Sequence, residues 1–165
     1  MKKWVLFIVF FITCISLFGA GSRSINILYH HSMRIDYREI DLEIRSTNSS
    51  GRDYNIRVIT RHLRGRDING ENIYSSEENI VPIENEFFEY IYNELMNIDF
   101  QEILRTTENI GGADGNRVTI RFGAMNYITV SLWTPNSMIE NTNIARVNQL
   151  IVEIFEKIGL LEWYT

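Results

Sequence analysis

The sequence predicts a single α+β domain in which one antiparallel sheet of about five strands carries two helices on one face, in the order β-β-β-α-β-β-α. Two observations lead to this prediction. Short segments in which apolar and polar residues alternate come in pairs across turns, as antiparallel hairpins require. Two longer segments repeat apolar residues every three or four positions, which is the pattern of a helix buried along one side.

Five segments have the alternation that is typical of half-buried strands. In residues 37–45, for example, Ile40, Leu42 and Ile44 alternate with charged residues, so one face of this strand is expected to be buried. Residues 65–81 are polar and contain an Asn-Gly turn, and we expect them to form the longest loop. The five expected strands cover residues 24–31, 37–45, 54–63, 117–122 and 127–133.

Two amphipathic helices are predicted from the periodicity of apolar residues. The first covers residues 85–97, where Phe88, Ile91 and Leu95 share one side, and residues 99–104 add another turn. The second begins at residues 141–143, whose side chains can cap a helix, and ends before Gly159, where a helix end favours glycine. The apolar tail, residues 160–164, is expected to pack back on the body of the domain.

The first 22 residues have the order of a secretory signal peptide. A basic start is followed by an apolar run over residues 4–18 and then by small residues. The run is about 15 residues long, shorter than the roughly 20 that a membrane-spanning helix needs, although an uncleaved anchor is an alternative. Small side chains allow cleavage after Gly21 or after Ser22. The expected mature domain is residues 23–165, exported to the periplasm or the extracellular space.

Cys14 is the only cysteine of the chain, and it lies inside the apolar run. An alternative interpretation is that Cys14 is lipidated and that acyl chains tether the domain to the envelope. Thr13 before it and the apolar residues after it favour ordinary cleavage instead. Cleavage leaves a domain without cysteine, which excludes disulfides, thiol catalysis and cysteine-ligated zinc.

The charges are distributed unevenly along the chain, whose formal net charge is -5. Residues 23–66 contain nine arginines and five acidic residues, whereas sixteen acidic residues follow them. One interpretation is a basic sheet surface beside acidic helices, and the other is an anion-binding face on the first strands. Nucleic-acid binding is not expected, because the chain is acidic and has no basic motif interleaved with aromatic residues.

The last part of the chain resembles a known pattern. An Asp114-Gly115 pair, a strand, a tight turn, a strand that ends in Trp133-Thr134-Pro135, and a long helix follow one another over about fifty residues. This order resembles that of small secreted bacterial proteins of an uncharacterised family. The resemblance implies the α+β fold and export, and it implies no activity.

The histidines and acidic residues are the candidates for chemistry. His30 and His31 are neighbours, so on a strand they face opposite sides and cannot ligate one metal together. His62 with one of them, and with Asp36 or Glu39 nearby, would be needed for a metal site. No spacing typical of metal ligands or of a nucleophile elbow occurs in the chain, and we expect no cofactor.

The leading hypothesis is a non-catalytic binding or envelope-associated protein. Its partner, an unidentified protein or a small ligand, would meet the uncovered sheet face or the loop over residues 65–81. Arg57, Arg61 and His62 are the candidate ligand-binding residues, although Arg57 and Arg61 are also positioned for ion pairs with acidic residues of the preceding strand. The alternative is a secreted hydrolase in which His30 or His62 acts with a nearby carboxylate.

Overall fold

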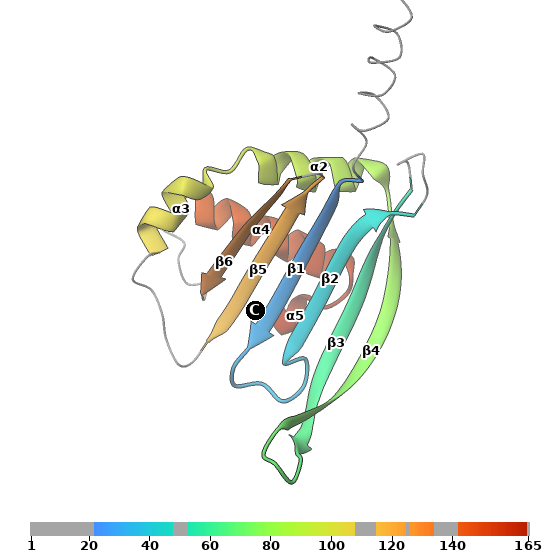
Figure 1. Cartoon of the computed structure of the whole chain (residues 1–165). Helices are drawn as coiled ribbons and strands as arrows, with labels where there is room; N and C mark the ends of the chain where they lie inside the picture. The colour runs from blue at the N-terminus through green and yellow to red at the C-terminus, as the bar shows by residue number, and fades with distance from the viewer. Residues whose placement is uncertain (1–21, 48–52, 108–114, 125, 134–141, 165) are drawn as a thin grey trace, which may run out of the picture.

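The computed structural model describes residues 22–47, 53–107, 115–124, 126–133 and 142–164. One antiparallel sheet of six strands, in the order β4-β3-β2-β1-β5-β6, forms one layer, and the helices form a second layer behind it (Figure 1). The predicted α+β class, with one antiparallel sheet and two main helices, is confirmed. The elements are β1 (Ser24–His31), β2 (Glu39–Ser46), β3 (Tyr54–Arg66), β4 (Asn72–Ile83), α2 (Asn85–Met96), α3 (Phe100–Thr107), β5 (Asn116–Gly123), β6 (Tyr127–Trp133), α4 (Thr142–Lys157) and α5 (Leu161–Tyr164).

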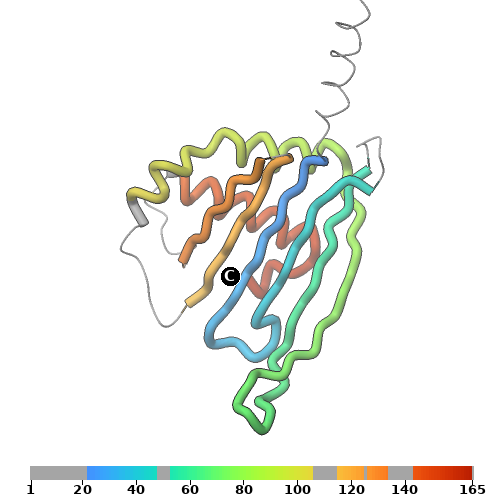
Figure 2. Tube along the Cα trace, viewed as in Figure 1, coloured from blue at the N-terminus to red at the C-terminus, as the bar shows by residue number. Residues whose placement is uncertain are grey.

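The first strand lies in the interior of the sheet. It pairs on one side with β2 and on the other side with β5, both antiparallel, so it joins the first strands of the domain to the hairpin formed by β5 and β6. Figure 2 shows this arrangement along the chain trace, with β1 between β2 and β5. In the predicted strands, the alternation of apolar and polar residues determines which face of the strand is buried. In β1, Ile25, Ile27 and Tyr29 are buried toward the helices.

The helices attach to the sheet through aromatic packing and ion pairs. The Phe88 ring of α2 stacks on Tyr54 of β3, with ring centroids 3.8 Å apart. Arg23, next to β1, donates hydrogen bonds to the Glu89 carboxylate of α2. Helix α4 is linked to α2 by the pair of Arg146 with Glu94, whose atoms are 2.7 Å apart. The predicted helix stripes therefore pack against the sheet, and together with the buried strand residues they form one core.

The C-terminal segment packs back on the body of the domain, as expected. Tyr164 of α5 is buried, and its hydroxyl donates to Asn148 Oδ1 at 2.5 Å. The indole of Trp163 stacks on Tyr37, with ring centroids 4.1 Å apart. Gly159 has a φ of 74°, which confirms the predicted glycine at the end of α4.

The prediction that residues 65–81 form a loop is wrong. Residues 72–83 form β4, which pairs with β3 along its length and lies at the edge of the sheet. Most of its side chains, except that of Ile83, are exposed or partly exposed on both faces, including those of Glu77 and Asn79 on the side of the helices. The strand therefore lacks the alternation of buried and exposed residues by which the other strands were predicted.

The hairpin of β3 and β4 extends beyond the other strands (Figure 2). The predicted Asn-Gly turn closes it. The Asp67 carboxylate accepts backbone hydrogen bonds from Asn69 and Glu71, at 2.9 Å and 2.8 Å, and Gly70 has a φ of 82°. Such Asp side-chain bonds and a glycine with positive φ are the usual chemistry of a tight turn.

Residues 1–21 of the predicted leader, Cys14 among them, lie outside the described residues, and its last residue, Ser22, is described. Within the described part of the chain, no helix combines the length and the apolar character needed to cross a membrane.

Candidate ligand-binding site

One face of the sheet is not covered by the helices and is called the open face here (Figure 1). It carries the residues that alternate with the core positions, so most of its side chains are polar or charged. The register of the paired strands places these side chains in rows that run across the sheet. Residues far apart in the sequence therefore become neighbours there.

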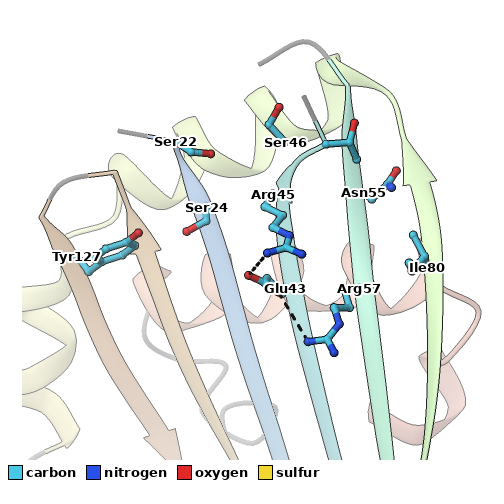
Figure 3. Close-up of a pocket in the computed structure, with 10 residues that line it drawn as sticks. Ser22, Ser24, Glu43, Arg45, Ser46, Asn55, Arg57, Ile80 and Tyr127 are labelled. Carbon is cyan, nitrogen blue, oxygen red and sulfur yellow. Dashed lines mark hydrogen bonds and ion pairs between the residues drawn. The ribbon is translucent and has the colours of Figure 1, made fainter. Parts of the chain in front are cut away.

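A hollow of about 590 Å³ lies at one end of the open face, close to the start of β1 (Figure 3). Five of the six strands contribute to it, and only β5 does not. Among the described residues that line it, Tyr127 from β6 is the only aromatic residue and Ile80 the only aliphatic one, and the others are polar or charged. The lining residues are Ser22, Ser24, Glu43, Arg45, Ser46, Thr47, Asn55, Arg57, Ile80 and Tyr127.

Both arginines of the hollow have carboxylate partners. Arg57 holds Glu78 through two hydrogen bonds of 2.8 Å and 3.0 Å, and its Nη1 lies 4.0 Å from Glu43 Oε2. Arg45 Nη1 lies 3.5 Å from Glu43 Oε1. The hydrogen bonds with Arg57 lower the pKa of Glu78, so this carboxylate stays charged. Arginine donors and carboxylate acceptors therefore lie next to one another, with their charges largely balanced.

Two arginines of β5 lie over aromatic rings of β6 on the same face. The Arg121 guanidinium is 4.3 Å from the centre of the Tyr127 ring, and that of Arg117 is 5.3 Å from the Trp133 ring. At exposed sites a cation–π contact of this kind contributes roughly 0.5–1 kcal/mol. Arg121 therefore favours this position of the Tyr127 ring at the rim of the hollow.

A row of paired side chains crosses the open face on the far side of Asp41 from the hollow. Strand register places Arg61, Glu39, His30, Arg117 and Trp133 side by side on five successive strands. Glu39 forms an ion pair with Arg61, and its Oε2 lies 3.8 Å from His30 Nδ1. The pKa of His30 is nevertheless lowered, first by partial burial and then by the positive charges of Arg38 and Arg117.

Asp41 lies between this row and the hollow. Its pKa is raised, first by burial and then by the neighbouring charge of Glu43, although Arg57 opposes the change. Opposite Asp41, strand register places Leu28 and Ile59 rather than a cationic residue. The predicted cross-strand pairing of the acidic residues of β2 with the arginines of β3 thus involves Glu43 and Glu39, but not Asp41.

The three residues predicted to bind a ligand do not form one site. Arg57 lines the hollow, and Arg61 lies on the same face but in the separate row. His62 belongs to the opposite face of the sheet, where it is 7% exposed. Its Nδ1 lies 3.4 Å from the backbone N–H of Tyr37, which donates to it, and 3.6 Å from Asp36 Oδ1. A role for Arg61 or His62 in binding stays a prediction.

The two histidine–carboxylate pairs that the hydrolase hypothesis would use lie on opposite faces. His30 with Glu39 is on the open face, whereas His62 with Asp36 is on the face of the helices. Neither histidine lines the hollow. Among the residues that the structure describes, no group of three or more His, Cys, Asp and Glu side chains is arranged to hold a metal ion.

Tyr127, Arg45 and Asn55 line the hollow but were not predicted as site residues. They come from three strands, and their proximity depends on the order of the strands and on the pairing of β1 with β5. The alternation within each strand shows that these residues face away from the core. It does not show which residues of other strands lie beside them.

Comparison of the chain with protein-family models, with curated proteins and with solved structures finds no match. The resemblance to small secreted bacterial proteins therefore stays a prediction.

Proposed function

We propose that this chain is an exported, non-catalytic binding protein whose ligand occupies the hollow on the open face of the sheet. The observation that supports this best is the composition of the hollow. Hydroxyl, amide, guanidinium and carboxylate groups from four strands, β1, β2, β3 and β6, converge on a space of about 590 Å³. Ligand pockets commonly have a volume of this order, with a few polar groups that fix the orientation of the ligand.

The balance of charge in the hollow favours an uncharged ligand with many hydroxyl groups, such as an oligosaccharide. An anion would be attracted by Arg45 and Arg57 but repelled by Glu43, which lies between them, and by Glu78, which already occupies Arg57. Hydroxyl groups can both donate and accept, so they match neighbouring guanidinium and carboxylate groups. The ring of Tyr127 offers a flat apolar surface for the C–H face of a sugar.

Titration of the exported protein with neutral oligosaccharides tests this proposal. Amide chemical shifts of the protein are recorded with a panel of oligomers of glucose and of N-acetylglucosamine, in α and β linkage. Inorganic phosphate is titrated in the same way for comparison. We expect at least one oligosaccharide to shift signals of Ser24, Arg45, Arg57 and Tyr127, and phosphate to leave them unchanged. Shifts caused by phosphate alone would contradict the uncharged ligand, and a hollow unaffected by every compound would contradict the proposed site.

Arg57→Ala and Arg61→Ala form a matched pair for the same titration. Both arginines lie on the open face of β3 and both have a carboxylate partner, but only Arg57 lines the hollow. Loss of a charged hydrogen-bonding group costs roughly 1.5–3 kcal/mol, so Arg57→Ala should weaken binding about tenfold or more. Arg61→Ala should leave the affinity within about twofold, because it removes no group from the hollow. Equal losses in the two variants would contradict the assignment of the site.

Export is tested on the full chain expressed in a bacterium. We expect mass spectrometry of the protein from the periplasm or the medium to find Ser22 or Arg23 as the first residue, because only small side chains precede these two cuts. An acyl chain on Cys14 would instead support the tethered alternative. An intact Met1 in the cytoplasm would contradict export.

A further inference from the structure

The two edges of the sheet differ in how they discourage pairing with another strand. Edge strands expose unpaired backbone N–H and C=O groups, and proteins commonly protect them with charges, proline or bulges. At one edge, β4 carries Glu77, Glu78 and Pro82, and a bulge interrupts its pairing with β3 between Leu63 and Gly65. At the other edge, β6 has neither a charged residue nor a proline along its seven residues.

We propose that β6 pairs antiparallel with β6 of a second copy of this chain, about a two-fold axis at Val130. The sequence of β6, Tyr-Ile-Thr-Val-Ser-Leu-Trp, is complementary to itself in this register. On the open face, Tyr127 lies opposite the partner's Trp133, and Thr129 opposite the partner's Ser131. On the face of the helices, Ile128 lies opposite the partner's Leu132. Each of these pairs joins side chains that stabilise antiparallel strands when they are opposite one another.

Exposure of the side chains along β6 supports this pairing. Tyr127 and Ile128 are each 42% exposed, although aromatic and β-branched residues of a strand are usually covered by neighbours. Pairing with a second copy would cover part of both. Among the described strands, β6 pairs only with β5, which leaves its other edge open for a partner strand.

Symmetric self-pairing of β4 would place unfavourable side chains opposite one another, which explains why a second copy would use β6. A symmetric antiparallel pair about the centre of β4 has its two-fold axis at Glu77 or at Glu78, and it would place that glutamate opposite the same glutamate of the partner. Like charges directly opposite one another destabilise a strand pair. Self-pairing is therefore disfavoured at β4 and has no such obstacle at β6.

The interface would be small, because it rests on one short strand from each copy. Stable complexes usually bury about 1,200–2,000 Å², and smaller interfaces are generally weak. We therefore expect a reversible dimer with a dissociation constant in the micromolar range. The two-fold axis would place both open faces on the same side of a continuous sheet.

Sedimentation of the exported protein over a wide range of concentration tests the proposal, together with two charge variants. One variant combines Thr129→Lys with Ser131→Lys, and the other combines Thr129→Glu with Ser131→Glu; both positions are exposed on the open face. Each variant alone should be a monomer, because like charges would face each other twice. An equimolar mixture should restore the dimer through two Lys–Glu pairs across the axis. Rescue of this kind requires the proposed register.

The matched control is Ser76→Lys, which adds a charge to the exposed face of the other edge strand and should leave the dimer unchanged. Circular dichroism on each variant distinguishes loss of pairing from loss of the fold. A parent protein that stays monomeric at every concentration would overturn the proposal, and slow amide exchange along β6 in that monomer would show that the chain covers this edge itself. A dimer that persists in both charge variants would also overturn it, because the interface would then lie elsewhere.

Discussion

Replacement of Phe88 by alanine is expected to lower the free energy of unfolding by about 3–5 kcal/mol, the usual cost of removing a buried phenyl ring. Phe88 is fully buried in α2, stacks on Tyr54 and lies 5.7 Å from Tyr92 between ring centroids. The Arg23 guanidinium lies 5.6 Å from the centre of the same ring. The substitution thus removes the contact that joins the first main helix to β3 and leaves a cavity between the layers.

Urea denaturation followed by circular dichroism measures this effect, and Tyr90→Ala is the matched control. Tyr90 lies on the same helix but is 45% exposed, so its loss should cost no more than about 1 kcal/mol. Each variant replaces an aromatic residue of α2 by alanine, so the change in helix propensity is similar in both. The difference between their free energies of unfolding therefore measures the effect of burial. Similar losses in the two variants would contradict the packing of α2 against the sheet.

Gly123→Ala is the second substitution for which we expect a large effect, about 3 kcal/mol or more, because strain and overlap add. Gly123 ends β5 with a φ of 149°, a conformation that side chains rarely adopt. A methyl group there would lie 2.1 Å from the backbone oxygen of Asn126, which cannot move aside without moving the turn. Because Gly123 pairs with Tyr127, the substitution should also displace the ring that lines the hollow.

Gly65→Ala separates the effect of backbone strain from the effect of overlap with the turn. Gly65 has the same φ of 149°, but a methyl group added there would meet no atom within 4 Å. It should therefore show the conformational strain alone, roughly 1–3 kcal/mol. Thermal or urea denaturation of both variants gives the difference, which measures the overlap with the turn at Asn126. Equal stabilities would mean that the turn adapts to the methyl group.

Local patterns in the sequence predicted the elements whose two sides face different surroundings. The helix α2 and the strands β1 and β6 agree with the predicted segments within about one residue. In α2 and β1 most apolar positions meet the core and the polar positions do not. The edge strand β4 was missed because its helix-side residues, such as Glu77 and Asn79, are exposed like those of its other side. Pairing with β3, and not burial, makes this segment a strand.

The candidate site was predictable only in part. Alternation placed Arg57 on a face away from the core, and the hairpin predicted its carboxylate neighbours on β2. The hollow itself depends on contacts between segments that are about a hundred residues apart, such as Ser24 and Tyr127. No local pattern encodes the pairing of β1 with β5, which brings these residues together.

Because β1 lies in the interior of the sheet, the sheet cannot be completed before β5, which ends at Gly123, is available. β1 is among the first segments to be synthesised, yet one of its two neighbours, β5, begins at Asn116. Contacts between such distant segments form slowly, because a long loop must close before they stabilise anything. We expect a nascent chain with this topology to complete its sheet later than one built from local hairpins alone, which would keep it unfolded for the export proposed above.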